Sequence, residues 1–247
     1  MDVGCGSNAN ATYSMLESGA GKVYAFDLDE TIFETVPICL KDFEGKYVLS
    51  TDNVLTMQFN DNFFDFVHCA GVLHHTRDFF AGLKQLARVT KNGGTLFIMT
   101  YGKGGLVRDI TSHLRNKYKQ DEDFKSLIDN LNADIFIQLF EEIFTIMRNH
   151  NDSMWDKIPM EIIQSLFDED LVLAIKDRIT APVYHEHSEE ELVSFLTNCG
   201  FSKIERLTRY SGLKNIRRFL SPLYYKYDSQ FAKLLYGSGT IHLKALK

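Results

Sequence analysis

The first hundred residues alternate between short runs of β-branched and aromatic residues and longer segments in which apolar residues recur every three or four positions. Runs of the first kind predict strands, and the second spacing predicts amphipathic helices. The predicted strands cover residues 1–3, 22–27, 47–50, 64–70 and 95–101. The predicted helices cover residues 9–18, about 32–40 and 79–90, and residues 92–94 predict a turn. This alternation is typical of a parallel sheet that is covered by helices.

The pattern changes from residue 104 to about residue 180, where the sequence predicts helical structure. Apolar residues recur there at steps of three and four, a spacing that is typical of a packed helix face. They are Ile128, Leu131, Ile135, Leu139, Ile143 and Met147. We expect this segment to form a helical cap over the ligand-binding edge of the sheet.

The alternation of helices and strands returns in the last third of the chain. Ser188 and Glu191 have the spacing of a capping box and predict the start of a helix, which Gly200 ends. Two final strands are predicted over residues 202–208 and 239–246. We therefore divide the chain into three parts. They are a core at 1–102, a helical insertion or cap at 103–180 and a C-terminal part of the core at 181–247.

Composition and charge narrow the classes of protein to consider. The chain has 247 residues, of which 45% are hydrophobic and 24% charged, which suits one large domain with an insertion. A net charge of −6 argues against sequence-independent nucleic-acid binding, which depends on Lys and Arg. The four cysteines lack metal-site spacing, so no metal is expected. The sequence shows no signal peptide and no apolar run that could span a bilayer, which predicts a cytoplasmic location.

Residues with candidate chemistry follow the first three predicted strands. Gly4 and Gly6 form a turn that lets a ligand approach the backbone closely. Asp27 comes about twenty residues later and suits both hydroxyls of a ribose, or else a helix cap. Asp52 follows the third strand and suits an adenine amino group, or else a plain turn. The full dinucleotide fingerprint would require glycine where Ala9 stands.

These segments together resemble the core of class I S-adenosylmethionine-dependent methyltransferases, in the type 11 group that includes the ubiquinone-biosynthesis enzymes. The resemblance is carried by DVGCGSN from residue 2, VYAFDLDE from residue 23 and LKQLARVTKNGGTLFIMTYG from residue 83. Its most specific part is STDNVLTMQFNDNFFDFVHCAGVLHHTRD, from residue 50. APVYHEHSEEELVSFLTNCGF, from residue 181, is similar to a C-terminal segment of the same group. The resemblance implies a Rossmann-like α/β three-layer sandwich. Its sheet would be mostly parallel and seven-stranded, with a helical insertion after the fifth strand.

The resemblance also implies S-adenosylmethionine as the cofactor, bound by the core at 1–102. It assigns the cofactor contacts to eleven residues: Asp2, Gly4, Cys5 and Gly6 at the methionine part, Asp27 at the ribose, Leu28, Asp52 and Asn53 at the adenine, and Ala70, Gly71 and Val72 below the sulfonium. The chain departs from the group in two places. Asn8 stands where many relatives have a third glycine. Relatives usually have a helix and a full first strand before this turn, and the sequence leaves open whether the chain is a fragment that lacks them.

The expected reaction is methyl transfer to a small-molecule or lipid-like acceptor, with oxygen as the predicted acceptor atom. An acidic hydroxyl would need a base, and His75 and His74 after the fourth strand are the candidates. Either ring could instead pack beneath the next helix or bond the loop. His185 and His187 precede a helix, and we expect surface or capping roles for them.

Two other functions remain open at this stage. A catalytically inactive, methyltransferase-like binding subunit would account for the short N-terminal strand. An NAD-dependent oxidoreductase would use a similar sheet, but the absent third glycine argues against it. Tyr184 and Trp155 suit either an apolar pocket or the core. The six basic residues between Arg206 and Lys226 suit either an anionic substrate or a solvated face.

Overall fold

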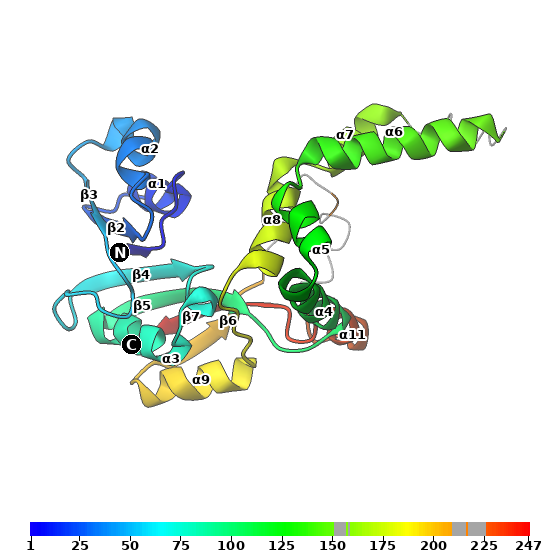
Figure 1. Ribbon diagram of the computed structural model, residues 1–247. Coiled ribbons are helices and arrows are strands. Elements are labelled where there is room, and N and C mark those ends of the chain that lie inside the picture. Colours follow the sequence, from blue (N-terminus) through cyan, green and yellow to red (C-terminus); the bar gives the residue numbers. More distant parts are fainter. Residues whose placement is uncertain (151–156, 158, 209–215, 217–225) are drawn as a thin grey trace. The chain divides into compact units, whose positions relative to one another are not determined.

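The computed structural model describes residues 1–150, 157, 159–208, 216 and 226–247 (Figure 1). The chain divides into two compact units. The first comprises residues 1–103, 183–207 and 240–247, and the second comprises residues 104–182 and 208–239. Residues 208–239 thus belong to the second unit, whereas the division made from the sequence groups them with the core. Helix α11 (Gln230–Tyr236) packs against α4 (Leu106–Gln120), which accounts for this difference.

The first unit is built on a seven-stranded sheet with the order β3-β2-β1-β4-β5-β7-β6. The strands are β1 (Asp2–Val3), β2 (Val23–Asp27), β3 (Tyr47–Thr51), β4 (Phe64–Ala70), β5 (Thr90–Tyr101), β6 (Ser202–Arg206) and β7 (Thr240–Leu246). Only β7 runs antiparallel to its neighbours. The predicted Rossmann-like, mostly parallel, seven-stranded fold is therefore confirmed. Strand β1 lies between β2 and β4, so the strand order reverses there, as at the ligand-binding switch point of open α/β sheets.

Helices of the first unit bury the apolar faces that their spacing predicts. They are α1 (Asn10–Glu17), α2 (Ile32–Cys39), α3 (Phe79–Val89) and α9 (Glu189–Asn198), with short 3₁₀ turns η1 (Lys41–Phe43) and η2 (Leu73–His75). The main core joins β4 and β5 to α3 and α9, with Leu86 and Leu192 fully buried in it. A smaller cluster holds Ile32 and Val36 of α2 against Leu16 of α1. Figure 1 shows α1 and α2 beside the β1–β3 half of the sheet.

The prediction of a turn at residues 92–94 is wrong, because these residues lie within β5. The pairing with β4 shifts between Phe64 and Phe66, so that the extra residues of β5 form a bulge. Gly93 N donates to Lys247 O, and Lys247 N donates to Gly94 O. The end of the chain thus holds the glycine pair in the sheet, a long-range pairing that local turn chemistry does not reveal.

The predicted capping box at the start of α9 is confirmed. Ser188 Oγ accepts from Glu191 N, and Glu191 Oε2 accepts from Ser188 N. The Glu191 carboxylate also pairs with Lys103 Nζ at 2.5 Å. The hydrogen bond from Lys103 and that from Ser188 N lower the pKa of Glu191 from 4.5 to about 2.

We therefore expect Glu191 to contribute stability that is present above pH 4.5 and is lost as the pH falls toward 2. The sign follows because folding lowers the pKa of this carboxyl, so protonation in acid favours the unfolded chain. Glu191→Gln should lower the urea midpoint at neutral pH, and its midpoint should converge with that of the wild type in acid. Glu142→Gln, an exposed change on α6 (Ala133–Asn149), should match the wild type throughout. Parallel curves for Glu191→Gln and the wild type would contradict this expectation.

The second unit is helical over its described residues. Its helices are α4, α5 (Glu122–Asp129), α6, α7 (Met160–Leu166), α8 (Glu169–Thr180) and α11. The buried Arg115 of α4 donates to the carbonyl oxygens of Arg178 and Ala181 at the end of α8, where a cation stabilises the helix C-terminus. The apolar stripe predicted as a packed helix face is only partly buried, since Ile128 and Leu131 are buried and Leu139 is half exposed.

Helix α11 was not predicted from the sequence.

Within the described ranges, no helix combines the length and the apolar character that crossing a membrane requires.

Candidate functional site

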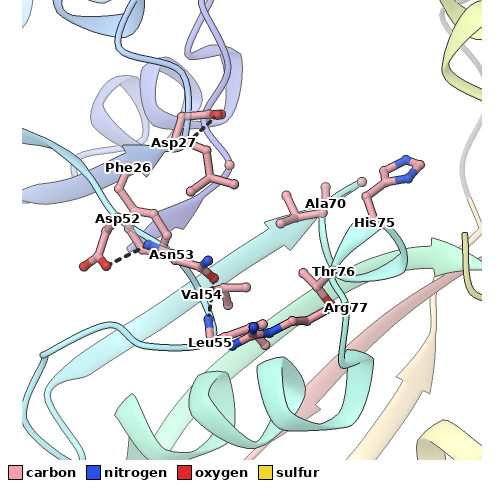
Figure 2. Close-up of a pocket in the computed structure, with 14 residues that line it drawn as sticks. Phe26, Asp27, Asp52, Asn53, Val54, Leu55, Ala70, His75, Thr76 and Arg77 are labelled. Carbon is pink, nitrogen blue, oxygen red and sulfur yellow. Dashed lines mark hydrogen bonds between the residues drawn. The ribbon is translucent and has the colours of Figure 1, made fainter. Parts of the chain in front are cut away.

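A cavity of about 580 Å³ opens at the carboxyl ends of β1, β2, β3 and β4, within the first unit. Its lining residues are Gly4, Phe26, Asp27, Leu28, Asp52, Asn53, Val54, Leu55, Ala70, Gly71, Val72, His75, Thr76 and Arg77. Figure 2 shows Asp27, Asp52 and Asn53 on one side of this space, and Ala70, His75 and Thr76 on the other. The cavity thus lies at the switch point of the sheet, where this class of fold binds ligands.

The glycine turn after β1 forms one edge of the cavity. Gly4 N and Cys5 N both donate to Phe26 O, at 2.9 and 3.1 Å, which ties the turn to the end of β2. Gly4 has φ +67°, and a Cβ placed on it would lie 2.2 Å from Val72 Cγ2. Only glycine fits here, because the backbone passes against the Val72 side chain in a left-handed conformation. The absence of a side chain at Gly4 lets the turn pack directly against Val72 at this edge of the cavity.

Asp27 ends β2 with its carboxylate held by backbone amides. Oδ2 accepts from Gly6 N at 2.9 Å, and Oδ1 accepts from Leu28 N at 2.7 Å and Asp29 N at 3.2 Å. A carboxylate oxygen has two lone pairs, so these bonds orient the group and leave acceptor capacity for a ligand. The side chain is therefore pre-positioned in the cavity lining.

The loop after β3 supplies a second acidic position. Asp52 N donates to Asp27 O at 3.2 Å, so the ends of β2 and β3 lie side by side. Asp52 Oδ1 accepts from Asn53 N, and Asn53 Oδ1 accepts from Leu55 N, which makes this a turn stabilised by its own side chains. The two alternatives considered for Asp52 are thus compatible, because the turn also lines the cavity.

The turn after β4 forms the far side of the cavity and separates the two adjacent histidines. His75 lines the cavity, and its Nδ1 lies 3.1 Å from Val183 O. His74 is buried, stacks on Tyr101 with ring centroids 3.8 Å apart, and has Nδ1 3.3 Å from Thr100 Oγ1. The 3₁₀ turn η2 points consecutive side chains in different directions, so only His75 reaches the cavity.

Three of the residues assigned to the cofactor do not line the cavity. Asp2 is buried behind the glycine turn, where it accepts from Thr12 Oγ1 at 2.7 Å and pairs with His68 Nδ1 at 2.9 Å. Gly6 contributes its N–H to Asp27. Burial, with the nearby charges of Asp2 and Asp27, raises the pKa of Cys5 to about 12, so its thiol stays neutral at physiological pH. These residues support the turn.

The structure adds five lining residues that the sequence analysis did not single out. They are Phe26, Val54, Leu55, Thr76 and Arg77. Each lies within two residues of a predicted position, so closeness in sequence was the available signal. Figure 2 shows the Arg77 side chain extending toward Leu55.

Other predicted candidates lie elsewhere. Tyr184 packs against Tyr101 with ring centroids 5.3 Å apart and is absent from the lining. Arg206 of the basic run pairs with Glu189 at 2.6 Å. Trp155 and the basic residues between 209 and 218 lie outside the described residues.

The part of the chain that matches known protein families contains all the lining residues of this cavity. A family model described as a methyltransferase domain matches residues 1–98. The chain is 32% identical over 93 residues to the uncharacterized protein MJ0638 of Methanocaldococcus jannaschii, covering 37% of this chain and 41% of that protein. It is 31% identical over 104 residues to a demethylmenaquinone methyltransferase of Bacillus mycoides, covering 40% and 43%. The alignments thus span about two fifths of the length of these relatives.

Solved structures share the fold over the whole chain. The YcgJ protein of Bacillus subtilis aligns with a TM-score of 0.51 and 13% identity, over 100% of this chain and 90% of that one. Phosphoethanolamine N-methyltransferase 2 of Haemonchus contortus, solved with phosphomonomethylethanolamine and S-adenosylhomocysteine, aligns with a TM-score of 0.52 and 16% identity. That alignment covers 100% of this chain and 48% of the other.

Proposed function

We propose that this chain, a member of the class I S-adenosylmethionine-dependent methyltransferases through its matched domain and its sheet, binds S-adenosylmethionine in the β1–β4 cavity and methylates a small acceptor. One observation carries the proposal: the glycine turn after β1 and the acidic residues that end β2 and follow β3 line a single cavity. Three segments that lie far apart in sequence converge there as recognition of one nucleoside would require.

The residues of the cavity fit this cofactor. The Gly4 backbone passes directly against Val72 at the cavity edge, and Asp27 presents a carboxylate oriented by three amides. The Leu28 side chain is 72% exposed at the cavity, so its apolar surface is available to pack against a ligand. In the proposal, Asp27 accepts the ribose hydroxyls, Leu28 packs on the adenine, and Asp52 with Asn53 holds the adenine edge. Asp2, Cys5 and Gly6 act indirectly by shaping the turn.

The protein's part in the reaction is binding, alignment and proton removal. When bound, S-adenosylmethionine supplies an activated methyl group. Ala70, Gly71 and Val72 would form the floor beside the reacting atoms, and a fixed floor aligns the two reactants. Among the lining residues that the structure describes, His75 carries an imidazole, which can take the proton of an acceptor hydroxyl. We assign the base to His75 and a packing role to His74.

The acceptor is proposed to be a small or lipid-like molecule that is methylated on oxygen. The partly apolar lining with Val54, Leu55 and Val72 supports an apolar acceptor. Two similar proteins also support a small or lipid-like acceptor. One is named for demethylmenaquinone, and the other was solved with phosphomonomethylethanolamine. A net charge of −6 favours a small molecule over nucleic acid.

Calorimetric titration of the full chain tests the cofactor. S-adenosylhomocysteine should bind, and NAD should not compete with it. Asp27→Ala should weaken binding about 5- to 150-fold, because it removes hydrogen bonds to the charged group worth about 1–3 kcal/mol. Asp29→Ala, an exposed acid outside the lining, is the matched control and should bind as the wild type does.

An absence of binding by S-adenosylhomocysteine, or an unchanged affinity in Asp27→Ala, would overturn the cofactor assignment. Formation of S-adenosylhomocysteine from added S-adenosylmethionine, in the presence of hydroxylated aromatic and lipid-like compounds, then tests turnover. Binding without turnover across that panel would favour the inactive binding subunit.

A further inference from the structure

Residues 183–187, which we name the clamp segment, are bonded to the turn that carries His75. His185 N donates to His74 O at 2.9 Å, and His185 Nε2 lies 2.9 Å from Thr76 O. A carbonyl oxygen only accepts hydrogen bonds, so His185 Nε2 carries a proton and donates it. One residue thus bonds the carbonyls on both sides of His75.

The other end of the clamp segment is fixed to β5. His187 N donates to Tyr101 O, and Lys103 N donates to His187 O, both at 3.1 Å. The His187 ring packs against Phe79 and Phe80, with centroids 4.1 and 4.8 Å away, and its side chain is 12% exposed. The segment is therefore held at both ends, and these contacts fix its position relative to the His75 turn.

This arrangement places a carbonyl oxygen against the His75 ring. Val183 O lies 3.1 Å from His75 Nδ1, so in the neutral ring Nδ1 carries the proton. Nε2 then has the lone pair, which is the form that a base requires. The partner of one imidazole nitrogen decides the state of the other in this way at many functional histidines.

We propose that His185 is a positioning residue, which holds Val183 O against His75 and so keeps His75 in the tautomer with its proton on Nδ1. The inference rests on the proposed role of His75 as base. It assigns a task to the paired hydrogen bonds of His185, for which the sequence suggested only a surface or capping role. His185 itself acts through the backbone and is absent from the cavity lining.

Two-bond ¹H–¹⁵N correlation spectra of histidine side chains in the full chain test this without knowledge of the acceptor. Spectra are recorded well above the ordinary histidine pKa of about 6.5, where the rings are neutral. The His75 signals are assigned by their loss in His75→Gln. The wild type should show His75 protonated on Nδ1.

Substitution at His185 should change that signature. His185→Phe keeps a ring of similar size and removes the donor. It should shift the His75 tautomer ratio roughly fivefold toward Nε2, as loss of one hydrogen bond predicts. His185→Gln, whose amide can donate from nearly the same place, should restore the wild-type ratio. His113→Ala, an exposed histidine on α4, should leave the His75 signals unchanged.

A wild-type His75 protonated on Nε2 would overturn the proposal, and so would an unchanged ratio in a folded His185→Phe. Circular dichroism confirms folding of each variant. Titration with S-adenosylhomocysteine on the same samples tests cofactor binding separately from the effect of His185 on the His75 tautomer. Failure of that ligand to bind would contradict the proposed function and leave the tautomer result standing.

Discussion

Alanine in place of Gly105 is expected to destabilise the second unit by about 3–5 kcal/mol, from backbone strain and overpacking together. Gly105 has φ 85° and ψ 152°, a conformation essentially restricted to glycine. An added Cβ would lie 2.2 Å from Gly237 N and 2.4 Å from Tyr236 C. Both are backbone atoms at the end of α11, and they cannot move without displacing that helix from α4. Urea denaturation followed by circular dichroism measures the loss.

The neighbouring glycine provides the control for this substitution. Gly104 also has a positive φ, +79°, but an added Cβ would meet only Gly237 Cα at 3.9 Å, an ordinary contact. Gly104→Ala should therefore cost about 1 kcal/mol, from the backbone conformation alone. Equal losses for Gly104→Ala and Gly105→Ala would show that close packing between α4 and α11 does not govern this site.

Gly4→Ala is expected to lower the free energy of unfolding by about 2–4 kcal/mol and to weaken S-adenosylhomocysteine binding at the same time. The new Cβ would lie 2.2 Å from Val72 Cγ2, and a β-branched side chain has little freedom to turn away. Either Gly4 or Val72 must move, and both line the cavity. Urea denaturation and calorimetric titration give the two measurements.

A double-mutant cycle isolates the collision at this position. Val72→Ala removes the colliding methyl, so Gly4→Ala combined with Val72→Ala should recover about 1–3 kcal/mol relative to additive losses. Gly6→Ala is the control for backbone strain, because Gly6 has φ +63° and an added Cβ meets nothing within 4 Å. Strict additivity of the two changes would contradict the close approach of Gly4 to Val72.

Local patterns were sufficient for the elements that surround the site. Strands β2 and β4 were predicted within one residue of their ends, because β-branched and aromatic runs bounded by turn residues leave few alternatives. The N-terminus of α9 was equally clear, since a capping box satisfies backbone donors by side chains only three residues apart. The bulge at residues 92–94 was missed because its cause is pairing with Lys247, at the far end of the chain.

The sequence by itself determined the alternating α/β architecture and the residues at the ends of β1, β2 and β3, because strand ends and glycine turns leave local signatures. Only the tertiary structure decided which of these residues face a common space. It separated His75 from His74 by the geometry of one 3₁₀ turn, and it brought Val183, 108 positions along the chain, against the His75 ring. Such contacts depend on where distant segments pack, and no spacing along the chain encodes that position directly.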